Sequence, residues 1–242
     1  MGIWIGIICI VLLALAVLLR FGVRNFFYPT ASTMPAIISK PMPEILAQLE
    51  ATLKTSAPHV LASLNSGLSA DEIAKIEVQY DIRLPDEIKE IYRWHDGSLR
   101  ATNFLSGDFI PTHRFLPLEE ALAEKLASSP AKAAWLQRLA CAFFAGHRDS
   151  WVSLFSDGAG DGYWFDPKRK PTEGSVFFNF TETGTYEFFP SANNLMAGIA
   201  KCYEQGAFYV KAGSSPPELD EDFHRSAKIL EEFSASNQPR TP

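Results

Sequence analysis

At Trp151 the residue pattern of the chain changes, and the change limits the folds available to it. Apolar residues recur at helical spacing before this point, whereas short aromatic and β-branched runs follow it, separated by Gly, Asp, Pro and Thr. The runs read WVSLF, YWFD, SVFFNF and TYEFF. Such short, punctuated runs are typical of an antiparallel meander. Helices are expected before and after it, so the order of elements predicts an α+β fold.

Several of the expected helices carry capping signals. Ser69 and Glu72 form a capping box, Pro85 stands where a first-turn proline belongs, and Gly97 is a candidate C-terminal cap. Residues 132–145 fit either a helix or a buried strand. The expected helices cover residues 44–54, 69–80, 85–95, 118–127, 191–204 and 219–233.

The N-terminus carries an apolar run without a charge, from Ile3 to Leu19. Extended to Val23, this run makes a helix of about 31 Å, which is long enough to span the hydrocarbon core of a bilayer. Its isoleucines, leucines and valines all favour insertion. Residues 3–23 are therefore predicted to form a transmembrane helix.

The residues that flank this run favour an uncleaved anchor. A cleaved signal peptide is the rival interpretation, but no basic residue precedes the run, and no polar mature start follows it. Arg20 can reach the headgroups, and Phe26, Phe27 and Tyr28 look like an interfacial aromatic belt. Because Arg20 and Arg24 follow the run, the positive-inside rule places the C-terminal side in the cytoplasm. We expect a single-pass protein of the bacterial inner membrane.

Three further segments follow the predicted anchor. Residues 24–43 contain four prolines and are expected to form an extended linker. Residues 44–210 are expected to form the α+β domain. Residues 216–234 are expected to form a C-terminal amphipathic helix, with its apolar residues at helical spacing.

Charge and cysteine content restrict the partners and cofactors. The formal charge is −6, and residues 1–39 contain no acid, so the domain itself is acidic. Nucleic acid would be repelled, whereas a basic protein would be attracted; the alternative is that the charge only aids solubility. Cys9, Cys141 and Cys202 lack the spacing of a disulfide framework or a zinc site. No metal or other cofactor is expected.

The segment from Asp157 to Gly162 consists only of Asp, Gly and Ala, and apolar runs flank it. A calcium loop counted from Asp157 would lack an oxygen ligand at Ala159 and would have Lys168 where a glutamate is needed. A phosphate-binding loop would need a helix next, but a strand is expected there. Glycine supplies positive φ and aspartate bonds its own backbone, so a hairpin turn is the favoured interpretation.

Histidines and acids give only a weak catalytic signal. His95 and Asp96 adjoin at an expected helix end, where the dipole favours a protonated histidine without any catalysis. His113, His147 and Asp149 are scattered, and the motifs HxxxH, HExxH and GxSxG are absent from the sequence. A hydrolase built from these residues is an alternative, but we expect neither an enzyme nor a small-molecule substrate.

Several motifs occur in an order that resembles a known family. The first is the segment GLSADEIAKIEVQYDIRLPDEIKEIYRWHDGS, which contains two expected helices. Leu84-Pro85 joins the two helices, and His95-Asp96-Gly97 follows the second. The hairpin DGAGDGYWFDP, the strand EGSVFFNF and the helix FFPSANNLMAGIAKCY follow. Together they resemble the SUKH superfamily, in its Smi/Knr cell-wall-regulator-like branch, over about residues 65–205. Asp96 replaces the commoner asparagine, and Asn194-Leu195 replaces the usual phenylalanine.

The resemblance implies a twisted, mostly antiparallel sheet with helices packed on it. It also implies protein binding without catalysis, because many bacterial members are immunity proteins that neutralise toxins, and fungal members regulate cell-wall synthesis. The predicted anchor and the C-terminal helix are not part of the family core. We expect a membrane-anchored module that binds and neutralises a cognate bacterial toxin. The alternative is a membrane-attached scaffold for cell-wall or envelope assembly.

The expected partner-binding surface is the hairpin with the sheet around it. A toxin with a basic surface would meet the acidic side chains, and aromatic side chains would serve as anchors. Core packing is the competing interpretation for each aromatic residue. The candidate residues are Asp157, Asp161, Tyr163, Trp164, Asp166, Glu182, Glu187, Trp94 and Asp96.

Overall fold

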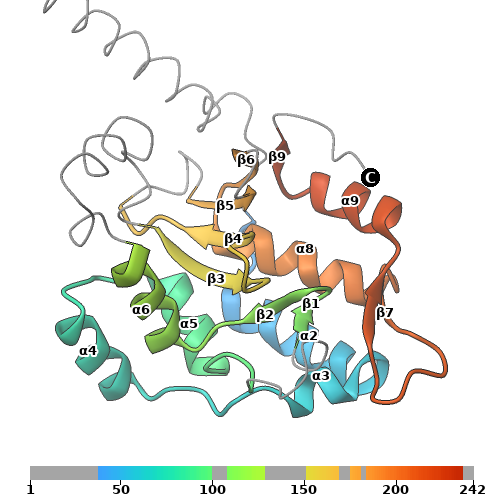
Figure 1. The fold of residues 1–242 in the computed structure, drawn as a ribbon, viewed down its shortest axis with the longest axis horizontal. Helices are drawn as coiled ribbons and strands as arrows, with labels where there is room; N and C mark the ends of the chain where they lie inside the picture. The colour runs from blue at the N-terminus through green and yellow to red at the C-terminus, as the bar shows by residue number, and fades with distance from the viewer. Residues whose placement is uncertain (1–37, 100–107, 129–150, 169–174, 181–183, 237–242) are drawn as a thin grey trace, which may run out of the picture.

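The computed structural model describes residues 38–99, 108–128, 151–168, 175–180 and 184–236. These residues form a large antiparallel sheet, helices packed against it, and a smaller two-stranded sheet (Figure 1). The predicted α+β class is therefore confirmed.

Among the described residues, seven strands form the large sheet in the order β1-β2-β3-β4-β5-β6-β9, and each neighbouring pair is antiparallel. Strands β1 to β6 follow chain order, so the predicted meander is confirmed. The strands are β1 (Asp108–Ile110), β2 (His113–Phe115), β3 (Val152–Ser156), β4 (Gly162–Phe165), β5 (Val176–Phe180), β6 (Gly184–Phe189) and β9 (Ala235–Ser236). The smaller sheet pairs β7 (Phe208–Val210) with β8 (Leu219–Glu221).

Helix α8 lies along the large sheet and contacts α2, α5 and α9, while α6 contacts β3 (Figure 1). The helices that enclose the core thus come from both halves of the chain. They are α2 (Met42–Ser56), α3 (Pro58–Ala62), α4 (Ala70–Gln79), α5 (Asp86–Trp94), α6 (Leu118–Ser128), α8 (Ala192–Glu204) and α9 (Phe223–Glu231).

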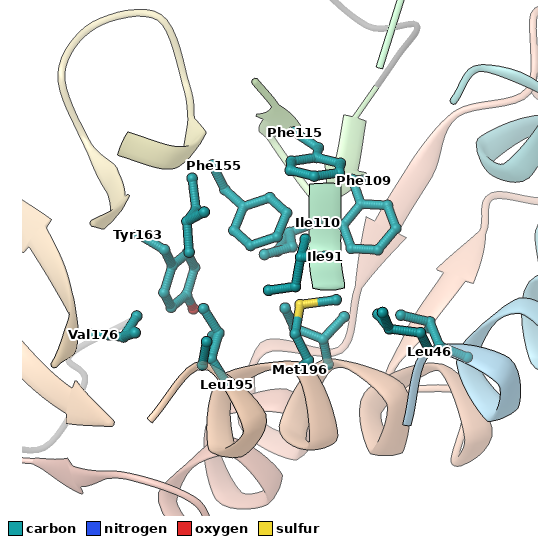
Figure 2. Packing of buried hydrophobic residues seen from close by; sticks show 14 of the residues in the cluster. Leu46, Ile91, Phe109, Ile110, Phe115, Phe155, Tyr163, Val176, Leu195 and Met196 are labelled. Carbon is teal, nitrogen blue, oxygen red and sulfur yellow. The ribbon is translucent and has the colours of Figure 1, made fainter. Parts of the chain in front are cut away.

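Aromatic rings from several strands of the large sheet fill the space between the sheet and α8. Phe109 and Phe155 are stacked, with 5.4 Å between their ring centroids. Phe155 and Tyr163 point toward the helix that carries Leu195 and Met196 (Figure 2). Burying one such side chain stabilises a fold by about 1.5–3 kcal/mol. The aromatic runs of the sequence therefore serve mainly to build this core.

Two buried tyrosines connect helices to strand β1 and to the residue that follows β2. The hydroxyl of Tyr92 on α5 donates to the carbonyl of Leu116 at 3.3 Å, and that of Tyr203 on α8 donates to the carbonyl of Phe109 at 2.6 Å. Burial raises the pKa of both hydroxyls, so both remain protonated and act as donors.

The predicted caps of α4 and α8 are confirmed. Ser69 and Glu72 form the reciprocal capping box at the start of α4. The Ser191 hydroxyl accepts from the backbone N–H of Asn194 at 3.2 Å at the start of α8. Both caps satisfy N–H groups that have no partner within the helix, which explains why these boundaries are readable locally.

The prediction that residues 219–233 form one helix is wrong. Leu219–Glu221 form β8, which pairs with β7, and α9 begins only at Phe223. Pro216 and Pro217 disfavour a helix immediately before this strand. The Asp222 side chain accepts from the backbone N–H of Arg225 at 3.2 Å, and this cap sets the actual start of the helix.

The sequence interpretation missed strands β1 and β2. Each has three residues, and Pro111 and Thr112 join them, with Thr112 at φ +66°. The strongest short-range hairpin signal is an Asn-Gly or Asp-Gly pair, which this turn lacks. The chain is thus not a simple succession of helices followed by a sheet.

Segments on both sides of the family-like region join the fold at the start of α8. The Ile38 backbone N–H donates to Asn194 Oδ1 at 3.1 Å, and Asn193 Nδ2 donates to the Lys40 carbonyl at 2.8 Å. From the C-terminal side, the Phe233 carbonyl accepts from Asn194 Nδ2 at 3.3 Å. The folded unit therefore includes residues well outside 65–205.

In the part of the chain that the structure describes, no helix has both the length and the apolar character needed to cross a membrane. The predicted span at residues 3–23, its flanking residues through Tyr28, most of the linker and the ambiguous segment 132–145 lie outside the described residues.

Candidate functional site

The β3–β4 turn is organised by one carboxylate. Asp157 Oδ1 accepts from the backbone N–H groups of Ala159, Gly160 and Asp161, at 2.8, 3.0 and 3.0 Å. Gly158 and Gly160 have φ values of +82° and +111°, which glycine adopts without strain. Residues 157–161, here called the hairpin end, thus form the turn that the Asp–Gly pattern predicted.

A glycine is also required where β4 begins. A Cβ atom at Gly162 would clash with the carbonyl oxygen of Phe155 on the neighbouring strand. The Ser156 hydroxyl, on the other side of the turn, accepts from the Gly158 N–H at 3.0 Å. The hairpin end is therefore held by polar bonds on one side and by close backbone packing on the other.

These contacts decide between the earlier interpretations of the loop. The N–H groups that a phosphate would need from Ala159, Gly160 and Asp161 are already bonded to Asp157. Over the described ranges, no three His, Cys, Asp or Glu side chains are grouped so that they could hold a metal ion. The hairpin interpretation is the one that the turn geometry supports.

Asn179 of β5 lies against the hairpin end and was not among the predicted site residues. The residue is only 5% exposed, and its Nδ2 donates to the Gly160 carbonyl at 3.4 Å. Its Oδ1 is buried and accepts no hydrogen bond from any residue that the structure describes. The only sequence feature that could have identified Asn179 as a site residue is that it is an amide inside the apolar run SVFFNF.

Asn179 belongs to a row of residues that crosses strands β1 to β5. Each member is paired with the next, in the order Asp108, Arg114, Ser156, Gly162 and Asn179. Successive side chains alternate between the faces of a strand. Because Phe155 points toward α8, the neighbouring Ser156 and hence the row lie on the opposite face.

Asp108 is the only carboxylate of this five-residue row. Burial raises the pKa of its carboxyl to about 6, although the Thr112 backbone N–H and the nearby Arg114 act in the opposite direction. Arg114 also donates to the Glu120 carboxylate and to the Ser98 carbonyl. The charge at this end of the row is therefore shared among several groups.

Two predicted surface residues are buried, which corrects their assignment to the partner-binding surface. Tyr163 is 2% exposed because its ring lies in the core (Figure 2). Asp166 is 4% exposed, and its Oδ1 accepts from the backbone N–H of Lys168 at 3.0 Å. Core packing and turn formation account for these two residues, so neither contributes to the candidate surface.

The other residues predicted on the sheet take different positions. Asp157 is exposed, and Asp161 and Trp164 are partly exposed near the hairpin end. Glu187 pairs with Phe178 and Ser236, and Glu182 lies outside the described residues. The candidate surface is thus narrower than the sequence suggested and is centred on the hairpin end.

Trp94 and Asp96 lie away from the hairpin end, at the C-terminal end of α5. Trp94 Nε1 donates to the Glu50 carboxylate at 3.0 Å, and this bond helps to lower the pKa of Glu50 together with the larger effect of Lys54. Asp96 Oδ1 accepts from the Leu118 N–H at 2.8 Å and so caps α6, while burial raises the pKa of this carboxyl. Both residues therefore connect helices.

His95 and Asp96 contact different groups, since His95 Nδ1 donates to the Asn65 carbonyl at 2.6 Å. The next residue, Gly97, has φ +71°, and a Cβ there would clash with Pro117. Helix α5 ends at Trp94 and is capped by His95, so Gly97 is not the C-terminal cap that the sequence suggested. A glycine is needed at this position because Pro117 approaches it closely. The segment 94–97 is thus a structural junction.

The comparison with known protein families places the chain in one of them. The sequence model of the SMI1 / KNR4 family (SUKH-1) matches residues 67–201, more than half of the chain. The chain therefore belongs to the SMI1 / KNR4 (SUKH-1) family, as the motifs predicted. No curated protein matches the chain. The matched region begins just before α4 and ends within α8, so it includes the hairpin end and Asn179.

Proposed function

We propose that this protein is a non-enzymatic, immunity-type module that binds a cognate bacterial toxin and neutralises it by covering its active surface. Membership of the SMI1 / KNR4 family is compatible with such a role. The observation that carries the proposal is the hairpin end, an exposed acidic turn held in one conformation by Asp157. A turn that is ordered before binding loses little entropy on association.

The charge of the hairpin end supports a basic partner. Asp157 and Asp161 lie within one turn, and the whole chain is acidic. Complementary charge speeds association and makes it sensitive to salt. Toxins that act on nucleic acid carry the basic surfaces that such a turn would attract.

The role of Asp157 in the turn dictates how this proposal is tested. Asp157→Asn combined with Asp161→Asn removes both charges but keeps an acceptor for the three backbone N–H groups. The full chain should protect cells against a toxin domain encoded beside its gene. The double variant should bind that toxin more slowly, with a weaker dependence on salt. Failure of the chain to protect against neighbouring toxin domains would contradict the proposal.

A distinct outcome would favour the alternative role. If deletion of the gene alters envelope assembly while no neighbouring toxin domain is neutralised, the domain is a scaffold for envelope assembly. Substrate turnover by the purified full chain would contradict both binding roles. Each result therefore selects a different class of protein.

The proposed module is anchored through residues 3–23 in the inner membrane, with its folded domain in the cytoplasm. Arg20 and Arg24, which follow the apolar run, support this orientation. Fusions at the C-terminus test it, since a fluorescent protein should be active there and alkaline phosphatase should be inactive. The reverse pattern would place the domain outside the cytoplasm.

A further inference from the structure

Asn179 has an unusual combination of burial and unused bonding capacity. Its amide nitrogen is bonded to the Gly160 carbonyl, whereas its amide oxygen is buried and accepts no bond from the described residues. Buried polar groups are nearly always paired, so an unpaired one calls for a physical explanation. A donor supplied from outside the domain would provide that explanation.

The rest of the hairpin end restricts the kind of donor. Asp157 Oδ1 accepts three backbone bonds, and Oδ2 of the same exposed carboxylate receives no donor from the residues described. The N–H groups of Ala159, Gly160 and Asp161 are occupied by these bonds. The hairpin end therefore presents acceptors and negative charge, which suit a cation that carries several N–H donors.

We propose that the hairpin end, together with Asn179, receives one arginine side chain of the protein partner. One N–H of the guanidinium would bond Asn179 Oδ1, and the Asp157 carboxylate would balance its charge. Arginine fits better than lysine because its several fixed N–H groups can address separate acceptors. This inference rests on the proposed function and names the group that the partner would contribute.

Asn179 Oδ1 is covered in the unbound structure, so binding of the arginine requires a local movement that exposes this oxygen. Gly158 has no atom within 4 Å of the position that a Cβ would take, so nothing packs against that side of the turn. The Asn179 bond to Gly160 is long at 3.4 Å. The contact between Asn179 and Gly160 is therefore the one that this movement gives up at lowest cost, while the three bonds to Asp157 keep the turn in its conformation.

The test uses the full chain in detergent micelles, labelled with nitrogen-15, and a blocked Gly-Arg-Gly peptide as the probe. The matched control peptide carries citrulline, which has nearly the same shape but no charge. The arginine peptide should shift the Asn179 side-chain amide and the Gly160 backbone amide, with a Kd on the order of millimolar. Equal shifts with citrulline, or no shifts at these residues, would overturn the proposal.

Two variants of Asn179 check the role of its oxygen. Asn179→Leu removes the acceptor and should weaken binding of the arginine peptide at least fivefold, whereas Asn179→Asp should tighten it severalfold. Asp220→Asn on β8 changes the charge at a site remote in sequence and should leave binding unchanged. Unaltered amide spectra away from the hairpin show that each variant is folded. Unchanged affinity in both Asn179 variants would contradict the inference.

Failure of this inference can be told apart from failure of the proposed function. If a cognate toxin binds the wild type and Asn179→Leu equally well, the toxin role stands and the arginine site is wrong. If the arginine peptide binds as expected but no toxin is neutralised, the site is real and the proposed function is wrong.

Discussion

Asn179 and Asn194 are both buried asparagines, yet they differ in how their amides are used. Asn194, which is 1% exposed, accepts at Oδ1 from the Ile38 N–H and the Ser191 hydroxyl, and donates from Nδ2 to the Phe233 carbonyl. Asn179 is 5% exposed and uses only its nitrogen. Burial alone therefore does not distinguish a structural amide from a candidate binding group.

The difference has an energetic meaning. Removing one partner of a buried hydrogen bond leaves the other unsatisfied, at a cost of about 1–3 kcal/mol, while an oxygen that is already unsatisfied has no such bond to lose. Asn194 should therefore be costly to replace, and Asn179 should be cheap to replace. The following predictions test this contrast, in order of decreasing effect.

Removal of the segments that Asn194 holds should have the largest effect. A fragment restricted to residues 67–201 lacks α2 and α9, which pack against α8, and it exposes the apolar surface that they cover. We expect this fragment to show no cooperative thermal transition, whereas residues 38–236 should show one. Circular dichroism measures both. A cooperative transition in the short fragment would mean that the flanking segments are dispensable.

Asn194→Ala should lower the free energy of unfolding by about 2–4 kcal/mol, because three groups lose their partner. Urea denaturation of the 38–236 fragment measures the change. Asn193→Ala is the matched control, since Asn193 Nδ2 makes a single bond, to the Lys40 carbonyl, and its loss should cost about 1 kcal/mol. Equal effects of the two substitutions would remove the special role of Asn194.

Asp157→Ala should lower the free energy of unfolding by about 1–2 kcal/mol, since three backbone N–H groups of the turn lose their acceptor and water replaces it only in part. Asp157→Asn should cost less, because the amide oxygen can still accept. The comparison uses the same denaturation assay. If both variants are equally unstable, the charge of Asp157, rather than its acceptor, holds the turn.

Asp108, at the other end of the row that contains Asn179, should make the stability of the fold depend on pH. Its folded pKa of about 6 lies above the value of about 3.9 for an unfolded aspartate, so the native state binds the proton more tightly. Stability should therefore rise as pH falls from about 6 to 4, by on the order of 1 kcal/mol after allowance for solvent screening. Asp108→Asn should show a smaller rise in pH-dependent denaturation, and burial of the Asp96 and Glu87 carboxyls, which raises their pKa values too, accounts for a remaining part. A rise of equal size in the variant would assign it to other groups.

Asn179→Leu should change the free energy of unfolding by less than about 1 kcal/mol, because the bond lost to Gly160 is long and the unsatisfied oxygen is removed with it. The variant thus separates stability from binding, and thermal denaturation checks it. A loss as large as that of Asn194→Ala would mean that Asn179 is a structural residue too.

Local patterns predicted much of the fold. The capping box at Ser69, the cap at Ser191 and the turn at Asp157 each depend on residues within four positions, and all three occur as expected. The missed strand β1 pairs with β2, and β2 pairs with β3, whose residues are about forty positions away; the turn between β1 and β2 carries no strong signal. Such short strands therefore cannot be predicted from the local sequence alone.

The candidate surface was predictable only in part, for the same reason. The alternation of side chains along β4 does not show which face of the strand is covered by the core. Tyr163 was therefore predicted as a surface anchor, but α8 covers its face of the sheet. Asn179 appeared to be one polar residue in an apolar strand, and its contact with Gly160 depends on how β4 and β5 are aligned. Register, rather than composition, brings these two segments together.

By itself the sequence determined the α+β class, the meander, the caps and the acidic turn, because each rests on bonds between near neighbours in the chain. Only the tertiary structure decided which polar groups are satisfied. The Ile38 N–H and the Asn194 side chain are separated by 156 positions, and no local pattern pairs them. The register of β4 and β5 places Asn179 against the hairpin end, where its buried oxygen has no donor from the described residues, and this oxygen marks the place where we expect a partner to bind.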